Sequence, residues 1–390
     1  MMITMILLYN LETIQFDIET AFLNGDLEET IYMEFPEGYE RYLMDQKVRL
    51  DSKKLKGDIK MYCLLLKKAL YGLVQAARQW WKKITETLAK IGFKPTEADP
   101  CLFVRHGANN EPPAFIILYV DDGGIIGTPK VIQEVLKALA SVFKVKNLGR
   151  MEHFVGCHLI RSKDKNTIWI HQPKLIKHLE SKFKDYIVTD RVFKTPAAPR
   201  TVFMRPGPND PKLSPTNQKT YRSGVGMLLY LIKHSRPDLS NAVRELSKVL
   251  DGATDAHWKA LIRTIKYVLD TKMYALRIKP NLKKGMFHLE GFLDSDFAGD
   301  RETRFSVHGY IIYFCGAPIS WKSKASKSVT LSSTEAEYFA ASETAKELMF
   351  VYGLLEGMGM KERLELPFTL RIDNTGAMYL ANNHATDKTY

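Results

Sequence analysis

Residues 117–126, ILYVDDGGII, place two adjacent carboxylates between two apolar runs rich in β-forming residues. Asp-Gly between such runs is a strong signal for a β-hairpin, so this segment predicts two antiparallel strands joined by a tight turn. A turn at Asp122-Gly123 would leave the acids at the hairpin tip by accident. A turn near Val120-Asp121 would hold both acids in position for a metal site, and acids elsewhere in the chain favour this second interpretation.

The first such acid lies in TIQFDIETAFLNGD, residues 13–26, which predicts a strand leading into a turn. Its apolar and polar residues alternate, so one face of the strand is apolar and the other presents Asp17. Alone, the pattern fits an edge strand with an exposed acid. If this strand and the hairpin are neighbours in one antiparallel sheet, their side chains come within roughly 5 Å. Three carboxylates so placed repel one another unless cations bridge them, and Mg²⁺ prefers oxygen ligands.

Between these acids, the segment from Leu64 to Phe93 predicts a helix that ends at Gly92. Its expected buried stripe follows 3-4-3-4 spacing and consists of Val74, Ala77, Trp81, Ile84 and Leu88. Arg78 and Lys82 lie on another face, where they would meet either solvent or phosphates. Gly72 would let the backbone approach a ligand closely.

The charge balance suggests a polyanionic partner. The chain has 56 Lys and Arg against 44 Asp and Glu, a formal charge of +12, and residues 41–90 hold thirteen basic and four acidic residues. The four cysteines are far apart and never form Cys-x-x-Cys, which excludes a zinc knuckle and favours buried thiols in a reducing, intracellular compartment. The apolar opening MMITMILLY is too short to span a bilayer and predicts the end of a buried helix.

The pattern along the chain predicts three regions. Residues 1–162 alternate strand-like and helix-like segments, and residues 163–285 combine a Pro-rich linker, KTPAAPRTVFMRPGPNDPKLSP, with helical segments. Residues 286–390 return to strands with one long helix from about Thr334.

A second set of acids lies in the third region. Asp294 ends a strand in GFLDSDFAGD, Glu337 lies in the first turn of the long helix, and Asp373 ends the strand in LRIDN. Two capping boxes are possible at the helix start, Ser332 with Glu335 and Thr334 with Glu337.

We assign Glu335 to the cap by preference, which leaves Glu337 as the candidate metal ligand. The nearby acids Asp296 and Glu343 remain open alternatives, because spacing alone does not exclude them.

Four motifs in this order resemble the reverse transcriptase of copia-type LTR retrotransposons. They are FDIETAFLNGDLEE, LKKALYGLVQAARQWW, YVDD and KNLGRMEHFVG. The resemblance implies that Asp17, Asp121 and Asp122 hold the catalytic metals. It also implies substrate contacts at the Gly72–Arg78 turn and near the Tyr-x-Asp-Asp motif. Phe22, five positions after Asp17, matches the family's bulky residue that blocks a ribose 2′-hydroxyl. The implied substrate-binding residues are Phe22, Gly72, Gln75, Arg78, Tyr119 and Val120.

The last hundred residues, with SSTEAEY on the helix, resemble the RNase H domain that follows the polymerase in these elements. The middle segment YRSGVGMLLYLIKHSRPDLSNAVRELS resembles the part that tethers the polymerase to the RNase H domain. The implied fold is an α+β polymerase palm with an antiparallel sheet and helices, a helical connection, and an α/β RNase H-like domain truncated at its C-terminus. In that domain, carboxylates hold two metal ions that direct water onto the RNA strand of an RNA–DNA hybrid. The resemblance implies this role for Asp294, Glu337 and Asp373. The implied cofactor is Mg²⁺ or Mn²⁺, two ions per active site. The implied partners are an RNA template, a DNA primer, dNTPs and an RNA–DNA hybrid, and no membrane.

The sequence also departs from that family. Val74 and Ala77 stand where Lys and Pro are usual, and Gly123 and Gly124 replace large apolar residues, which should loosen their strand. This sequence has no counterpart of the family's basic fingers segment, which is expected before Asp17, or of its fourth RNase H acid. Both departures predict a fragment of a polyprotein. The alternative is therefore an inactive retrotransposon remnant that at most binds nucleic acid. An integrase-like transposase is disfavoured, because its acids would run Asp, Asp, Glu.

Overall fold

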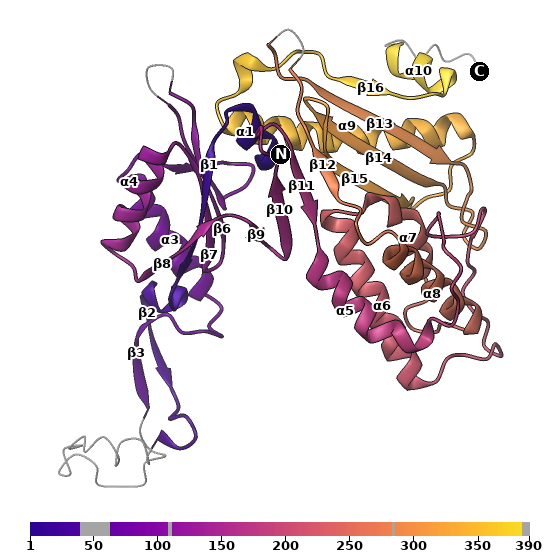
Figure 1. The fold of residues 1–390 in the computed structure, drawn as a ribbon, viewed down its shortest axis with the longest axis horizontal. Helices are drawn as coiled ribbons and strands as arrows, with labels where there is room; N and C mark the ends of the chain where they lie inside the picture. The colour runs from indigo at the N-terminus through magenta and orange to yellow at the C-terminus, as the bar shows by residue number, and fades with distance from the viewer. Residues whose placement is uncertain (40–62, 108–110, 283–284, 384–390) are drawn as a thin grey trace. The chain divides into compact units, whose positions relative to one another are not determined.

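The computed structural model describes residues 1–39, 63–107, 111–282 and 285–383 (Figure 1). The part of the predicted basic stretch at 40–62 and the last residues, 384–390, lie outside the described residues. The chain divides into two compact units. One comprises residues 13–150, and the other comprises residues 1–12 and 151–390.

The unit of residues 13–150 is built on a six-stranded sheet in the order β4-β5-β6-β7-β1-β8. The strand alternation predicted for residues 13–26 appears in β1, where Phe16 and Ile18 are buried and Asp17 is only half-buried. A separate hairpin joins β2 and β3. The strands of this unit are β1 (Glu12–Ile18), β2 (Asp26–Met33), β3 (Leu64–Lys68), β4 (Lys94–Pro95), β5 (Leu102–Arg105), β6 (Ala114–Tyr119), β7 (Asp122–Gly127) and β8 (Val145–Arg150).

Helices α3 (Ala76–Ala89) and α4 (Pro129–Ala140) contribute to one hydrophobic core with this sheet. The buried stripe of α3 differs from the predicted one. Val74 is 98% exposed, and the buried face runs through Ala76, Trp80, Ile84 and Leu88 at a spacing of four. The prediction failed at the helix start, because residues 71–75 form a turn with Gly72 at φ +98° and the helix begins only at Ala76.

The second unit contains two further sheets. The first is antiparallel in the order β12-β11-β10-β9, and the second has the order β15-β14-β13-β16, in which β16 alone runs parallel to its neighbour. The strands are β9 (His153–Phe154), β10 (Cys157–Arg161), β11 (Ile168–His171), β12 (Leu276–Ile278), β13 (Leu289–Asp296), β14 (Val307–Phe314), β15 (Ala317–Ala325) and β16 (Thr369–Arg371).

One long helix, α9 (Ser333–Gly357), lies across the second of these sheets (Figure 1). It can approach closely because Gly291 faces it. A Cβ added at Gly291 would stand 2.9 Å from Cγ2 of Thr344 on the helix. The short helix α10 (Thr375–Asn382) follows β16.

The remaining helices share a separate apolar core in the same unit. The predicted Pro-rich linker, residues 194–215, forms neither helix nor strand up to residue 211, and hydrogen bonds within it and just before it anchor it to these helices. Phe193 N donates to Asp270 Oδ2 and Phe203 N donates to Glu245 Oε2, both at 2.9 Å. These helices are α5 (Pro173–Phe183), α6 (Pro215–His234), α7 (Ser240–Ser247) and α8 (Asp255–Asp270).

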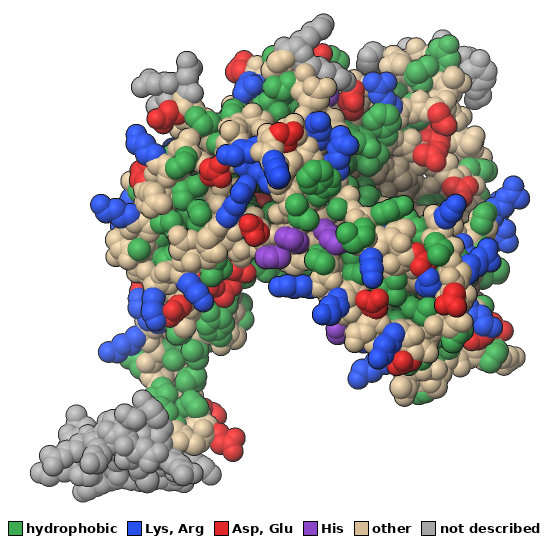
Figure 2. Space-filling view, viewed as in Figure 1, with side chains coloured by type: hydrophobic (Ala, Val, Ile, Leu, Met, Phe, Trp, Pro, Cys, Tyr) green, Lys and Arg blue, Asp and Glu red, His purple; other side chains and the backbone are tan. Residues whose placement is uncertain are grey.

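The apolar opening of the chain forms α1 (Met2–Leu8), with residues 4–7 buried, as predicted. Among the described residues, none of the helices is long and apolar enough to cross a membrane. Figure 2 shows Lys and Arg side chains at the surface of both units, interspersed with Asp and Glu. The mixed α and β composition with antiparallel sheets agrees with the sequence. The domain boundaries at 162/163 and 285/286 and the RNase H-like assignment stay predictions.

Candidate active sites

The first three predicted acids lie on β1 and at the β6–β7 hairpin, and we call Asp17, Asp121 and Asp122 the hairpin acids. Tyr119 pairs with Asp122, so the two-residue turn is Val120-Asp121, as the sequence favoured. Val120 adopts a left-handed φ of +62°, and its carbonyl accepts a hydrogen bond from the Trp80 indole at 2.7 Å. The amide of Ile18 donates to Asp121 O at 3.1 Å, which holds the turn beside Asp17.

The hairpin acids influence one another electrostatically. Partial burial raises the pKa of Asp122, and the negative charges of Asp121 and Asp17 raise it further. Nevertheless, oxygens from all three carboxylates do not come within 4.8 Å of one another, although each of these residues is described. The strands therefore bring the three carboxylates close enough to affect the pKa of Asp122, but their oxygens do not form a compact cluster.

The predicted substrate-binding residues lie on three segments of this unit. Phe22 lies in a short 3₁₀ helix, Ala21–Asn24, with its ring centroid 4.7 Å from that of Tyr71. Tyr119 and Val120 are 63% and 44% exposed. In the other predicted segment, Gln75 is half-buried at the start of α3, and Gly72 and Arg78 are exposed. The contacts of these residues with a substrate stay predictions.

Gly123 corrects one expectation from the sequence. A Cβ placed on it would lie 2.1 Å from Cζ of Phe16, whose ring is fully buried. The residue therefore leaves room for the Phe16 ring, and the sequence could not show this because the two positions are far apart. Gly123 lies in a well-packed strand, which argues against the loosening inferred from its small size.

The second set of predicted acids converges more tightly, and we call Asp294, Glu337 and Asp373 the strand–helix acids. Asp294 lies on β13, Glu337 in the first turn of α9, and Asp373 two residues after β16. One carboxylate oxygen from each lies within 4.8 Å of the other two. The parallel pairing of Phe292 with Arg371 sets Asp294 and Asp373 side by side, because each follows its paired residue by two.

Glu337 gives the strongest indication that this cluster fits a cation. Its side chain is only 5% exposed, and Oε1 accepts a hydrogen bond from Ser295 N at 2.9 Å. Oε2 is buried and has no hydrogen-bond partner in the described part of the chain. Burial raises the pKa of Glu337, and the charges of Asp294 and Asp373 raise it further, against the lowering effect of the Ser295 amide. A buried carboxylate oxygen beside two more acids is the donor set that a hard divalent cation requires.

The neighbouring acids have other roles in the structure. Glu335 caps α9, because Ser332 Oγ accepts from Glu335 N at 3.1 Å and the Glu335 carboxylate accepts from Leu331 N at 2.6 Å. Glu343 forms an ion pair with Lys346 at 2.6 Å. Asp296 turns its carboxylate toward Gly299, with Oδ2 only 2.3 Å from the position of a Cβ there. Neither Glu343 nor Asp296 joins the cluster.

The structure contains a cavity of about 470 Å³ that was not expected from the sequence, and Asp294 lines it together with Asn241 and Arg244 of α7. The pattern of α7 is that of an ordinary amphipathic helix, so nothing in it distinguishes Arg244 from a solvated basic residue.

Comparison with known proteins agrees with the motifs. The sequence model of the reverse transcriptase (RNA-dependent DNA polymerase) family matches residues 1–195. The retrovirus-related Pol polyprotein from transposon TNT 1-94 of Nicotiana tabacum is 34% identical over 97% of this chain and 27% of its own length. The corresponding polyprotein from transposon RE1 of Arabidopsis thaliana is 34% identical over 95% of this chain and 23% of its own length. The chain thus spans about a quarter of these curated relatives.

A smaller relative is covered completely. The putative transposon Ty5-1 protein of Saccharomyces cerevisiae is 29% identical over 85% of this chain and 100% of its own length. A solved structure of a foamy viral protease–reverse transcriptase with double-stranded DNA aligns over 89% of this chain and 50% of that chain. The alignment has 12% identity and a TM-score of 0.21, which is too low to support a conclusion. From the family model and the polyprotein relatives, the chain belongs to the reverse transcriptase (RNA-dependent DNA polymerase) family and is homologous to the Pol polyproteins of copia-type retrotransposons.

Proposed function

We propose that the chain carries two metal-dependent reactions on nucleic acid. The hairpin acids would serve RNA-directed DNA synthesis, and the strand–helix acids would serve hydrolysis of the RNA strand in an RNA–DNA hybrid. The observation that carries the second assignment is the buried Oε2 of Glu337, which has no partner within a cluster of three carboxylates. Family membership and the shared electrostatics of Asp122 with its two neighbours support the first.

The residues of each cluster would act by holding divalent cations. Carboxylate oxygens suit Mg²⁺ or Mn²⁺, and we propose two ions per site. When bound, such a pair activates a hydroxyl or a water and stabilises charge on the attacked phosphate. The rigid Ser295 amide orients Glu337 by fixing one of its oxygens, so that the other stays free for a ligand.

The proposed partners of the first site are an RNA template, a DNA primer and dNTPs. Phe22, held against Tyr71 and five residues after Asp17, would oppose a ribose 2′-hydroxyl with the face of its ring. The second site would take the hybrid that the first produces. We also propose the domain limits 1–162 for the palm, 163–285 for the connection and 286–390 for the RNase H-like domain.

The ribonuclease assignment is tested by cleavage of a labelled RNA–DNA hybrid in Mg²⁺. The intact chain should cut the RNA strand, and Asp294→Asn should abolish cutting. Glu343→Gln is the matched control, because that acid pairs with Lys346, lies outside the cluster and does not line the cavity. Undiminished cutting by Asp294→Asn would remove Asp294 from the site.

The polymerase assignment is tested by primer extension on an RNA template. Asp121→Asn should abolish extension, and equal signal from both proteins would refute the assignment. If the wild-type chain neither extends nor cuts but still binds the hybrid, the alternative of an inactive remnant that binds nucleic acid is supported instead.

A further inference from the structure

The cavity beside the strand–helix acids is lined by carboxylates on both sides and by a guanidinium on one. Asp294 and Asp296 of β13 line one part of it, and α7 lines another part with Asn241, Arg244 and Glu245. The Pro-rich segment Pro196–Val202 forms a further wall. A volume of about 470 Å³ is in the range of cavities that bind small groups.

Arg244 is incompletely used by its own neighbours. Its side chain is 15% exposed, and Nη2 donates to Asn241 Oδ1 at 2.7 Å and pairs with Glu245 Oε1 at 2.8 Å. Nε and Nη1 are buried and have no hydrogen-bond partner among the residues that the structure describes. Because a guanidinium is always charged and carries five N–H donors, two of its three nitrogens are left to bind an anion.

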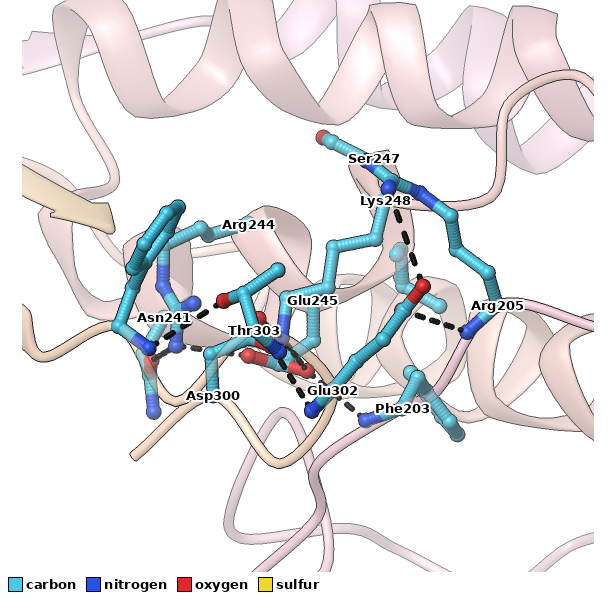
Figure 3. A network of polar contacts seen from close by, with 12 residues as sticks. Phe203, Arg205, Asn241, Arg244, Glu245, Ser247, Lys248, Asp300, Glu302 and Thr303 are labelled. Carbon is cyan, nitrogen blue, oxygen red and sulfur yellow. Dashed lines mark hydrogen bonds and ion pairs between the residues drawn. The ribbon is translucent and has the colours of Figure 1, made fainter. Parts of the chain in front are cut away.

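The surrounding polar network does not need those two nitrogens (Figure 3). Buried Glu245 also pairs with Lys248 at 2.9 Å and accepts from Phe203 N at 2.9 Å. Lys248 in turn pairs with Asp300 at 2.7 Å, and Asp300 accepts from Thr303 N at 3.0 Å. Both carboxylates of the network therefore have other donors. A turn of the guanidinium toward the cavity gives up the two Nη2 contacts but leaves neither carboxylate without a donor.

We propose that Arg244, with Asn241, binds a backbone phosphate of the nucleic acid whose RNA strand is cut at the strand–helix acids. The proposal rests on the proposed hydrolysis of a hybrid and extends that site onto α7. A backbone of evenly spaced phosphates would then meet the acids at one phosphate and the guanidinium at a neighbouring one. Charge-assisted hydrogen bonds from Arg suit phosphate, so Arg244 would set the register of the strand in the site.

Binding of a short fluorescent RNA–DNA hybrid, measured by anisotropy at several salt concentrations, tests the contact. Arg244→Gln should weaken binding about tenfold and lower the slope of log affinity against log salt by about one. Arg244→Lys keeps the charge but offers a single nitrogen, so it should recover only part of the affinity. Arg222→Gln is the matched control, because Arg222 is exposed on α6 and does not line the cavity.

A second experiment locates the phosphate by replacing each backbone linkage of the hybrid in turn with a neutral methylphosphonate. One replacement should weaken binding by the wild-type chain and have no further effect on Arg244→Gln. If thermal unfolding shows that Arg244→Gln does not fold, the comparison is made with Arg244→Lys. Identical affinities, salt slopes and replacement profiles for wild type and the folded variant would overturn the proposal, and so would a wild-type chain that does not bind the hybrid.

These measurements read binding and not turnover. A wild-type chain that binds the hybrid but does not cut it would count against the proposed hydrolysis, whereas an Arg244 variant that binds and cuts like wild type would overturn only the phosphate contact.

Discussion

In residues 13–150 the acids lie on a two-residue turn and on the adjacent strand, whereas in the second unit they come from two strand ends and a buried helix turn. The hairpin acids stay spread, and the strand–helix acids approach within 4.8 Å. A sheet fixes the spacing of neighbouring strands at about 5 Å. The distance between carboxylate oxygens on neighbouring strands is therefore limited by how far each side chain can turn toward the other. A helix packed on a sheet can insert a carboxylate between two strand ends, and Glu337 does so at the cost of burial.

The largest expected effect is on Mn²⁺ affinity, measured by titration calorimetry, and it distinguishes the strand–helix acids from the hairpin acids. Glu337→Gln removes the charge of a buried carboxylate that would bind the cation directly. Loss of a residue that only supports a metal ligand weakens metal binding by up to about 100-fold, so the loss of Glu337 should weaken Mn²⁺ binding at the strand–helix acids by at least that factor. Glu335→Gln is the control, because Glu335 lies two residues away and serves the cap. Normal binding by Glu337→Gln would contradict a cation site there.

The same titration has a defined pH dependence. The raised pKa values of Glu337 and Asp122 mean that protons compete with the metal at a higher pH than for an ordinary carboxyl. Affinity for Mn²⁺ should therefore fall as the pH is lowered from 7 toward those values. Glu337→Gln and Asp122→Asn should each remove this pH dependence from one cluster and leave it in the other.

Gly123→Leu tests whether the hairpin region is well packed or loosened. Because a Cβ at this position overlaps the Phe16 ring, the variant should lose about 1–3 kcal/mol of unfolding free energy and gain no primer extension. Gly226→Ala, at a helical glycine with open space around it, should be neutral or stabilising. A Gly123→Leu protein of unchanged or greater stability in urea unfolding would show that the strand is loose after all.

Asp300→Asn tests the network that ties α7 to the segment after β13. Burial alone would raise the pKa of Asp300, but the contacts with Lys248 and the Thr303 amide outweigh it and hold that pKa well below its usual range. Its stabilisation is therefore present above the ordinary Asp pKa near 4 and is lost as pH falls toward the lower folded value. The variant should be less stable by about 2 kcal/mol at pH 7, with a smaller difference at pH 3. A difference independent of pH would contradict this pairing.

The smallest expected effects are at the helix caps of the two units. Thr128→Ala on α4 removes a hydroxyl that accepts from Val131 N, and Ser332→Ala on α9 removes one that accepts from Glu335 N. Each should cost about 1 kcal/mol in unfolding free energy. A much larger loss of hybrid cleavage in Ser332→Ala than in Thr128→Ala would show that the α9 cap also positions Glu337.

Much of the local structure followed from the sequence. The alternation of β1 around Asp17 and the Ser332 and Glu335 cap depend on residues a few positions apart. The Val120-Asp121 turn was chosen over Asp122-Gly123 only because of the distant Asp17. The α3 stripe was predicted one position out of phase at its start, with Trp81 in place of Trp80. Periodicity alone did not reveal that the Gly72 turn delays the helix, or that the Trp80 indole is drawn inward to Val120 O.

The sequence by itself determined which residue types stand at which turns, strand ends and helix starts, because turn chemistry and side-chain alternation act over short distances. Only the tertiary structure decided which carboxylates meet. Glu337 joins Asp294 and Asp373, while Asp296 and Glu343 turn elsewhere, because the packing of α9 on β13 and the parallel register of β16 fix those positions. The same packing decided that Gly123 makes room for Phe16 and that Arg244 lines the cavity beside the acids, since these contacts join segments far apart in the chain.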